Sequence, residues 1–473
     1  MLTTNSQRPL HVVIVGASIS GLTLAHCLSS TNIDFTILEE RPSSFTDGAG
    51  LVLLPSGTRI LDQLGLYQDV LDWGERMVSH STWLEDGRLI RQVDTLDLDS
   101  VKRTGYPLII IARPALLSIL FTRLRDKNRV FFNKKVSRIA TSPDGVIVYT
   151  TDGSCVFGDL VVGADGVHST VRAQMWNYIQ YADPTAGRHI SEVPLTIAYT
   201  AVFGISRAHP GLHMGHVHRA YGHGWAMLVM VGPESEVFWF VSMPRPADKF
   251  IPRHSCSDKL FVSGIVEPFL EKHVSLDVKF GEVFNRTKSC VFVPLEESLQ
   301  TRWSWGRFAS IGDAVHKMTP NIAEGANCAI ETAVSLANHL VSFVEGSDNS
   351  YSEQRLHPAL KTWEESRWRR MKFFFTLSQI TVRLEVTTNW VLKMVRMYLG
   401  AFHGVGISFI TDITPSTAHV DYLPLPQRGE TGQDSKGKGK GKEKERSWNP
   451  SMFSTPIAAP VSSGLHVVRT AGG

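Results

Sequence analysis

The sequence predicts an α/β fold in which an antiparallel β-sheet is inserted into a domain with a parallel sheet, followed by C-terminal helices. Three observations predict this organisation. A β-branched strand with a glycine turn opens the chain at residues 11–21, and two further apolar strands end in turns near residues 165 and 313. Between these turns, residues 176–300 alternate β-branched and aromatic runs with Gly, Pro and His turns, which is typical of antiparallel strands.

The composition is that of a globular protein. The 473 residues include 48 Lys and Arg against 45 Asp and Glu, a formal charge of +3, with 43% hydrophobic and 20% charged residues. These values exclude a disordered or fibrous chain, and the nearly neutral balance indicates no nucleic-acid partner. The five cysteines form no CxxC pair, so neither a disulfide framework nor a zinc knuckle is predicted, and a reducing compartment is expected.

The first element is a βαβ unit. The strand HVVIV leads into the turn from Gly16 to Gly21, a helix follows, and FTILEE forms a second strand that reaches Glu39. Gly16 permits a tight turn, Gly21 lets the helix approach the strand, and Glu39 can accept hydrogen bonds from a ribose. Ser18 replaces the middle glycine of the GxGxxG pattern, but its side chain is small. A Rossmann-like dinucleotide site is the favoured interpretation, and a plain glycine turn is the alternative.

Two further strand-turn motifs follow in order. The segment DLVVGADGVHSTVR contains Asp165 and Gly166, and RFASIGDAVHK contains Gly312 and Asp313. After the second motif, apolar residues recur at helical spacing from about Gly325 onward. Each motif alone could be a strand that ends in a turn, but the three motifs in this order form a recognisable set.

The set resembles the signature motifs of the class A flavoprotein monooxygenases, the para-hydroxybenzoate-hydroxylase-like family, over about residues 8–345. The resemblance implies FAD as the cofactor and NAD(P)H as co-substrate. It also implies that Asp313 binds the ribityl chain, that Asp165 lies near the pyrophosphate, and that Arg113, in IIIARPALLSIL, contacts FAD. The alternatives are a helix cap for Asp313 and a solvated helix start for Arg113.

The helix after the third motif should face the flavin ring through its first backbone amides, where the positive end of the helix dipole stabilises negative charge. Ala326 and Asn327 are the residues expected at this contact, with Pro320 and Asn321 beside the ring. The predicted cofactor-binding residues are Gly16, Ser18, Gly21, Glu39, Arg113, Asp165, Gly312, Asp313, Ala326 and Asn327.

Within the family, ASISGLTLAHCL, GAGLVLLPSGTRILDQLGLY, HKMTPNIAEGANCAIE and VDYLPLPQRG are similar to the fungal epoxidases of meroterpenoid and indole-diterpene pathways. Two positions depart from the pattern, because Glu324 replaces a usual glutamine and Val52 aligns with a flavin-contacting glycine. The resemblance implies epoxidation of a prenyl-chain double bond with NAD(P)H and O2, before a terpene cyclase acts. An aromatic (phenol) hydroxylase, a flavin-dependent prenyl-chain reductase and a flavin-free binding scaffold remain as alternatives.

The inserted sheet should carry the substrate. Aromatic side chains at alternate strand positions are expected to point inward, as sheet core or as substrate contacts. They are Tyr199, Phe203, Tyr221, Trp225, Phe238 and Phe240. Tyr221 is the one candidate for a catalytic hydroxyl, with a buried structural tyrosine as the alternative. Histidines 213, 216, 218 and 223 have spacings that match no helix face, so no metal site is predicted.

These observations give four regions. The FAD-binding domain is expected over residues 8–175 and 301–345, the substrate domain over 176–300, a helical region over 346–427, and a disordered basic tail over 428–473. The helical region either packs on the protein or lies on a membrane surface. From Arg428 to Arg446 the tail holds seven basic and four acidic residues, which accounts for the whole net charge of +3.

The stretch from residue 9 to residue 33 lacks charged side chains and has the length of a membrane span or signal peptide. A strand, turn and helix explain it better, and residues 397–411 are too few for the roughly 20 that a span requires. We therefore expect an intracellular protein, cytoplasmic or peripherally associated with the endoplasmic reticulum membrane, and not a secreted one.

Overall fold

The computed structural model describes residues 8–42, 48–142, 144–183, 191–246, 256–346, 351–400 and 417–428. Its first layer is a six-stranded sheet that is parallel except for one edge strand, β18. The strands in order across the sheet are β18 (Ser304–Trp305), β19 (Phe308–Ser310), β12 (Leu160–Gly163), β1 (His11–Val15), β2 (Asp34–Leu38) and β8 (Val130–Phe131). The predicted α/β fold with a Rossmann-like sheet is confirmed.

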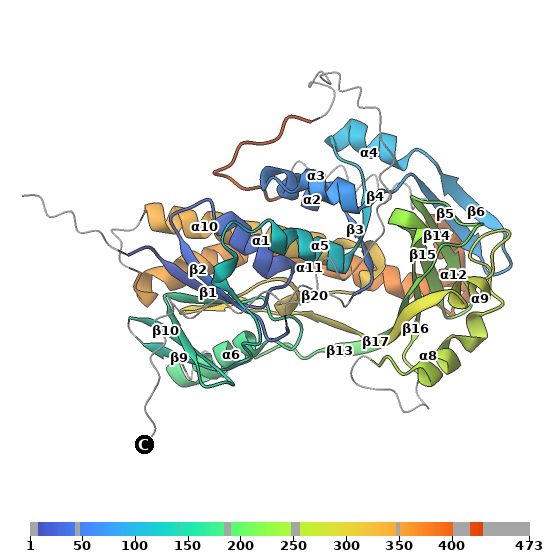
Figure 1. The fold of residues 1–473 in the computed structure, drawn as a ribbon. Coiled ribbons are helices and arrows are strands. Elements are labelled where there is room, and N and C mark those ends of the chain that lie inside the picture. Colours follow the sequence, from blue (N-terminus) through green and yellow to red (C-terminus); the bar gives the residue numbers. More distant parts are fainter. Residues whose placement is uncertain are drawn as a thin grey trace, which may run out of the picture.

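Both faces of this sheet are covered, as near-continuous apolar strands require (Figure 1). One face packs against α1 (Ile19–Leu28), α5 (Arg113–Thr122) and α10 (Glu324–Glu345) in the largest apolar core. The other face packs against α6 (Thr170–Ala182) and a small sheet. That small sheet consists of β9 (Val136–Ser142), β10 (Gly145–Thr150) and β11 (Cys155–Gly158), whereas η1 (Lys127–Arg129) precedes β8 and contacts β2.

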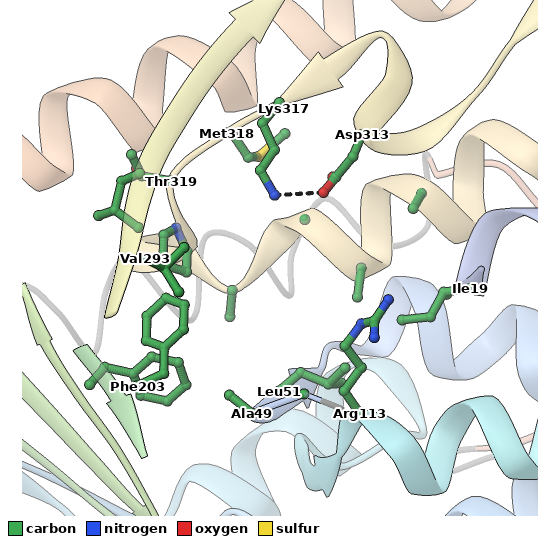
Figure 2. A pocket seen from close by; sticks show the side chains of 18 of the residues that line it. Ile19, Ala49, Leu51, Arg113, Phe203, Val293, Asp313, Lys317, Met318 and Thr319 are labelled. Atoms are coloured by element: carbon green, nitrogen blue, oxygen red, sulfur yellow. Dashed lines mark hydrogen bonds and ion pairs between the residues drawn. The ribbon is translucent and has the colours of Figure 1, made fainter. Parts of the chain in front are cut away.

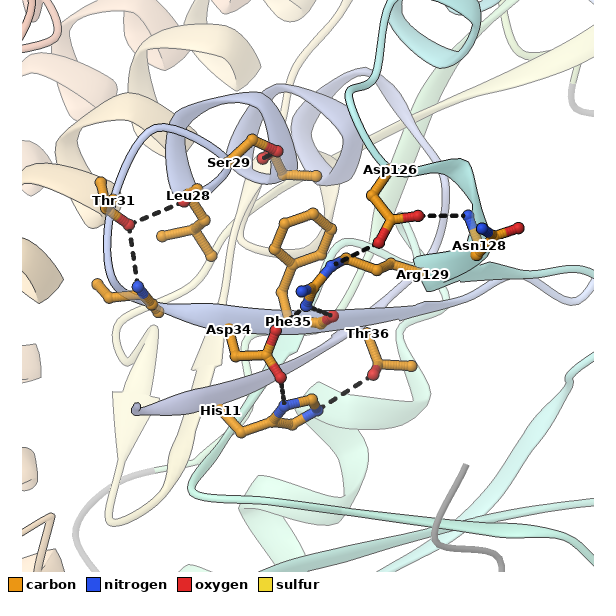
Figure 3. Close-up of polar contacts among 12 residues, drawn as sticks. His11, Leu28, Ser29, Thr31, Asp34, Phe35, Thr36, Asp126, Asn128 and Arg129 are labelled. Carbon is orange, nitrogen blue, oxygen red and sulfur yellow. Dashed lines mark hydrogen bonds and ion pairs between the residues drawn. The ribbon is translucent and has the colours of Figure 1, made fainter. Parts of the chain in front are cut away.

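Polar side chains join the amino-terminal ends of β1 and β2, at the end of the sheet away from the glycine turn (Figure 3). His11 Nδ1 lies 2.8 Å from Asp34 Oδ2, and its Nε2 lies 3.1 Å from Thr36 Oγ1. Arg129 pairs with Asp34 and reaches Asp126 at 3.2 Å. Burial of the His11 ring lowers its pKa to about 4, so the ring is neutral and the network is a fixed part of the sheet.

The second large sheet has eight strands and is antiparallel apart from the β14–β5 pair. Its strands in order are β20 (His316–Lys317), β17 (Thr287–Leu299), β13 (Thr196–Ser206), β16 (Val237–Pro244), β15 (Ala226–Val231), β14 (His216–Tyr221), β5 (Ser79–Leu84) and β6 (Leu89–Val93). The sheet is wider than the interval 176–300, because β5, β6 and β20 come from segments assigned to the FAD-binding domain. The two domains are therefore interleaved along the chain.

Short elements cover the two sides of the eight-stranded sheet. The outer side packs against α8 (Lys259–Val266), η3 (Glu267–Phe269) and α9 (Phe280–Phe284). The inner side meets a three-stranded sheet that links the two domains. Its strands and neighbouring helices are β3 (Gly50–Leu53), β7 (Ile109–Ala112), β4 (Glu75–Arg76), α2 (Pro55–Gln63), α3 (Tyr67–Trp73) and α4 (Leu96–Thr104).

Two helices follow the FAD-binding domain. The 33-residue helix α11 (Glu353–Glu385) contacts α10 and both large sheets, and α12 (Trp390–Gly400) returns beside β6 (Figure 1). Glu331 of α10 is fully buried and is paired with Arg367 and Arg370 of α11 at 2.8 Å each, which fixes α11 on the domain. No helix within the described residues is long and apolar enough to cross a membrane.

Residues 417–428 are not helical, although residues 417–427 fall in the predicted helical region and Arg428 begins the predicted disordered tail. They run as an extended strap back over the FAD-binding domain, where the Tyr422 hydroxyl donates to the Cys27 carbonyl at 2.9 Å. Arg428 pairs with Asp62 and lies over the Tyr67 ring. The rest of the predicted disordered tail lies outside the described residues.

Candidate active site

A large cavity lies between the parallel sheet and the eight-stranded sheet. Its volume is about 1730 Å³, well above the roughly 300–1,000 Å³ of a site for one drug-sized ligand. Its walls come from the turn after β1, the end of β2, the start of α5, the start of α10 and the inner face of the eight-stranded sheet. The cavity is therefore large enough for a dinucleotide and a second molecule together.

The glycine turn forms one end of the cavity. Gly16 has φ +104°. It lies so close to the end of β12 that a side-chain carbon at this position would be 2.5 Å from the Ala164 carbonyl oxygen. At Gly21 such a carbon would lie 2.1 Å from the Gly16 carbonyl oxygen. Both positions therefore need glycine, one for its backbone angle and both for space.

Ser18 shows why the middle glycine of the pattern can be replaced. Its φ of −83° and ψ of 178° are ordinary extended values, and its hydroxyl accepts a hydrogen bond from the Gly21 amide at 3.3 Å. The residue caps the amino terminus of α1, which directs unpaired amides and the positive helix end toward the cavity.

Glu39 lies at the carboxyl end of β2 and borders the same end of the cavity. One carboxylate oxygen accepts from the Ala17 amide at 2.7 Å, and the other accepts from the Arg41 amide at 2.9 Å. These two bonds hold the carboxylate beside the turn, and its remaining lone pairs are available for hydroxyl groups.

Arg113 and Asp313 extend into the middle of the cavity from opposite walls (Figure 2). Arg113 opens α5, and its amide donates to the Ala49 carbonyl at 3.0 Å. Asp313 follows β19, keeps 40% of its side chain exposed, and accepts from Lys317 Nζ at 2.6 Å. Burial acts to raise the pKa of Asp313, but the nearby Lys317, His316 and Arg113 outweigh it and lower that pKa, so the carboxylate is charged.

Asp165 borders the cavity but has internal partners. Its carboxylate accepts from the Ser169 hydroxyl at 2.5 Å and from the Thr170 amide at 2.7 Å, at the start of α6. Burial raises the pKa of Asp165 against the effect of these bonds. Its side chain therefore caps the start of α6, and Gly166 beside it lines the cavity.

The start of α10 presents Gly325, Ala326 and Ala329 to the cavity. Asn327 does not line it. Its amide nitrogen donates to the Val52 and Ala323 carbonyls at 3.1 and 2.8 Å, and its oxygen accepts from the Leu54 amide at 3.0 Å. The Asn327 side chain is fully buried and joins α10 to β3, which is a structural role that the motif alone does not reveal.

Glu324, the departure from the usual glutamine, opens α10 on the side away from the cavity. It is buried, and burial together with the Glu331 carboxylate raises its pKa to about 8. The Cys328 thiol donates to one of its oxygens at 3.7 Å. The acid is therefore neutral near pH 7, like the glutamine that it replaces.

Eight of the eleven predicted site residues meet around the cavity, and three do not line it. Those on its walls are Gly16, Ser18, Glu39, Arg113, Asp165, Asp313, Ala326 and Tyr221. Gly21 and Gly312 shape the turns behind the wall, and Gly312 has φ +64°. The Asn327 side chain is buried away from the cavity, so the predicted contact would have to come from its backbone amide.

Tyr221 belongs to a buried charged cluster at the other end of the cavity. Arg219 of the same strand pairs with Glu385, the last residue of α11. Glu385 also accepts from the Asn321 amide group. The Arg396 guanidinium of α12 lies 4.7 Å from the centre of the Tyr221 ring. We call Arg219, Tyr221, Glu385 and Arg396 the buried polar cluster, and all four line the cavity.

The chemistry of the buried polar cluster favours a protonated tyrosine. Burial, with the Glu385 carboxylate, raises the pKa of Tyr221 well above its ordinary value, and the two arginines oppose this only in part. Burial also raises the pKa of Glu385. The Tyr221 hydroxyl can therefore donate a hydrogen bond or a proton, and it is not a base near neutral pH.

The rest of this end is apolar. Of the six predicted inward aromatics, Phe203, Tyr221 and Phe240 line the cavity, and the rings of Phe203 and Phe240 meet edge to face at 4.8 Å. Trp225 and Phe238 are buried in cores instead, and Tyr199 packs near the end of α11. Helix α11 adds Phe373, Leu377 and Ile380 to the opposite wall.

The four histidines differ in burial, since His218 of β14 is buried in the sheet, His216 is half-buried and His213 is exposed. His218 accepts from the Trp83 indole at 3.3 Å, and burial lowers its pKa to about 4. His223 lies apart, 2.6 Å from Lys393. In the described part of the chain no group of three or more His, Cys, Asp or Glu residues could hold a metal ion.

A dinucleotide turn that opens onto a cavity shared with an antiparallel sheet is the architecture of the class A flavin-dependent monooxygenases. A family model described as an FAD binding domain matches residues 9–240 and 267–366, and the chain belongs to this family. The residues on the cavity fit FAD. The tight turn at Gly16 leaves the first amides of α1 free to bind a pyrophosphate, and the charged Asp313 carboxylate lines the middle of the cavity.

Relatives across most of the chain agree with this assignment. The FAD-dependent monooxygenase spyC of Aspergillus fumigatus is 35% identical over 90% of this chain and 90% of its own. The FAD-dependent monooxygenase olcE of Penicillium canescens is 34% identical over 89% of this chain and 91% of its own. The protein is therefore an FAD-dependent monooxygenase, and NAD(P)H is the co-substrate typical of this class.

A solved structure shows the same fold. HpxO of Klebsiella pneumoniae in complex with FAD and uric acid superposes with a TM-score of 0.71 at 21% identity, covering 86% of this chain and 97% of that one. The predicted class, fold class and cofactor are confirmed by these comparisons and by the sheet order.

The prediction missed the residues that come from the C-terminal helices. Glu385 and Arg396 lie far along the chain from any motif, in helices whose apolar spacing shows only that one face is buried. Lys317 was also missed, although its position four residues after Asp313 was a usable signal.

Proposed function

We propose that this monooxygenase epoxidises a double bond in the prenyl chain of a meroterpenoid or indole-diterpene intermediate. The observation that supports the proposal most is the apolar end of the cavity. Phe203 and Phe240 from the sheet and Phe373, Leu377 and Ile380 from α11 line it. Apolar walls of this extent suit an isoprenoid chain, because its burial removes hydrocarbon from water.

The cofactor-binding residues follow from the cavity walls. In the proposal, Glu39 holds the ribose of FAD, the turn from Gly16 to Ser18 holds the pyrophosphate, and Arg113 and Asp313 hold the middle of the molecule. The bound FAD supplies the redox chemistry, taking electrons from NAD(P)H and delivering one oxygen atom of O2. The amides of Gly325 and Ala326 stabilise negative charge at the start of α10.

Tyr221 is the proposed catalytic residue. Its raised pKa keeps the hydroxyl protonated, so it can orient the substrate or donate a proton. The reaction consumes one alkene, one O2, one NAD(P)H and one proton, and yields one epoxide, one NAD(P)⁺ and one water. We propose that a terpene cyclase uses the epoxide, since protonation of an epoxide starts a cyclisation, and that the enzyme works inside the cell.

Product analysis separates the epoxidase from its alternatives. The flavin-loaded protein is incubated with NADPH, O2 and a prenylated aromatic compound, and the product is examined by mass spectrometry and NMR. An epoxidase adds one oxygen and removes one alkene, whereas an aromatic hydroxylase adds one oxygen and keeps every alkene. A prenyl-chain reductase adds two hydrogens without oxygen. A product that retains all its alkenes would refute the epoxidase proposal.

A further inference from the structure

Helix α12 exposes an apolar face to solvent. Trp390 is 75% exposed, Met394 is 55% exposed and Val391 is 47% exposed. Leu392, Val395 and Met397 are exposed as well, so six apolar side chains lie on one short helix. Scattered exposed apolar residues are ordinary, but a contiguous group of this kind marks an interaction surface. We call these six residues the α12 apolar face.

The exposed charges of α11 and α12 next to the α12 apolar face are basic. Residues 366–397 contain seven arginines and lysines and a single acid, Glu385, which is buried and paired with Arg219. Three of the seven basic residues are buried or paired inside the protein, whereas Lys372 and Arg383 are exposed. The α11 surface beside the apolar face is therefore cationic, which complements an anionic partner.

The same surface is continuous with the cavity. Phe373 and Ile380 of α11 line the cavity and are 45% and 51% exposed, so they lie along its opening. Arg396 of α12 is buried on the opposite side of the helix and also lines the cavity. An apolar molecule that moves from the α12 apolar face into the cavity therefore passes the apolar side chains of Phe373 and Ile380 at the opening.

We infer that the α12 apolar face seats the enzyme on the surface of an anionic phospholipid bilayer, and that the prenylated substrate enters the cavity directly from the lipid. The second part rests on the proposed function. Trp, Met and aliphatic residues with basic neighbours are the combination that lies in a membrane interface. Over its 11 described residues the helix is about 16 Å long, shorter than a hydrocarbon core of roughly 30 Å, and we infer that this segment lies along the membrane surface.

Vesicle sedimentation tests the inference without any substrate. Flavin-loaded full-length protein is mixed with vesicles of phosphatidylcholine alone or with added phosphatidylserine, and the bound fraction is measured. The wild type should bind the anionic vesicles and bind the neutral ones more weakly. The double variant Trp390→Ser/Met394→Asp should lower the bound fraction roughly fivefold or more, because it removes apolar contact area and adds a repelled charge.

The matched control changes two equally exposed apolar residues elsewhere, Leu98 of α4 and Leu260 of α8. The variant Leu98→Asp/Leu260→Asp should bind vesicles as the wild type does. Since the basic tail is present in every variant, binding through the tail would survive the α12 changes. Equal vesicle binding by the α12 variant and the wild type, or no binding by either, would overturn the inference.

Two further readouts complete the test. Sedimentation equilibrium without lipid should give the same monomer mass for the wild type and the α12 variant, and a wild-type dimer that the variant dissociates would show a self-association face instead. The α12 variant should turn over a short, water-soluble prenylated compound at the wild-type rate but a vesicle-embedded one more slowly. If the epoxidase proposal is wrong, neither the water-soluble nor the vesicle-embedded compound would be epoxidised, but vesicle binding would be unchanged.

Discussion

The two ends of the cavity are built in different ways. At the end formed by the glycine turn, which we propose as the cofactor end, backbone turns determine the shape of the wall. Gly16, Gly21 and Gly312 have backbone angles or close approaches that leave no room for a side chain. At the other end, which we propose as the substrate end, the buried polar cluster joins β14 to α11 and α12 through long side chains, and Arg396 also donates to the Glu385 and Gly222 carbonyls. Local sequence therefore specifies the cofactor end, whereas tertiary packing specifies the substrate end.

Breaking the buried polar cluster should give the largest effect. Glu385→Leu leaves Arg219 buried without its charged partner, and loss of one member of such a pair lowers the free energy of unfolding by about 3–5 kcal/mol. Thermal or denaturant unfolding measures this. The control Arg383→Leu removes an exposed charge of the same helix and should change stability by less than about 0.5 kcal/mol. Equal effects of the two substitutions would contradict the account of the cluster.

Removing the Asp313 carboxylate tests the cofactor end. A hydrogen bond to a charged group contributes about 1.5–3 kcal/mol, so Asp313→Ala should weaken FAD binding by roughly 10- to 100-fold. Titration of the apoprotein with FAD measures the dissociation constant. Asp313→Asn keeps one acceptor oxygen, so its FAD dissociation constant should lie between those of the wild type and Asp313→Ala. A full flavin complement in Asp313→Ala would refute the assigned contact.

The buried acid at the start of α10 predicts a pH effect on stability. The pKa of Glu324 is about 8 in the folded protein and close to 4.5 when unfolded, so the folded state holds a proton that the unfolded state releases. Stability should therefore fall as pH rises from about 5 to 8, by up to about 1.4 kcal/mol per pH unit. Glu324→Gln should remove this slope. Parallel stability curves for both proteins would show that Glu324 ionises normally.

Removing the Tyr221 hydroxyl should have the smallest effect, confined to the substrate end. One neutral hydrogen bond contributes about 0.5–1.5 kcal/mol, so Tyr221→Phe should lower kcat by roughly two- to tenfold. The FAD content and the rate of flavin reduction by NADPH should not change, since Tyr221 lies beyond the cofactor end. If kcat is unaltered, Tyr221 is a core residue of the sheet.

The difference between the two ends of the cavity also explains which features could be predicted from the sequence. Three turn motifs predicted the parallel sheet and the cavity residues Glu39 and Asp313, because each motif is a local structure with a fixed place in the fold, whereas Arg113 was predicted only from the family resemblance. The side-chain role of Asn327 was not predicted, since a helical position does not reveal which side faces a segment 273–275 residues earlier in the chain. Glu385 and Arg396 were missed because only packing brings α11 and α12 to β14.

The central claim is that this cavity uses FAD to transfer oxygen from O2 to a prenylated substrate. Incubation of the flavin-loaded protein with NADPH and a prenylated aromatic compound under ¹⁸O2, followed by mass spectrometry, tests it most directly. The account predicts one ¹⁸O atom in each product molecule, with product formation lost in Asp313→Ala preparations that lack flavin. A product without ¹⁸O, or equal product formation without flavin, would contradict it.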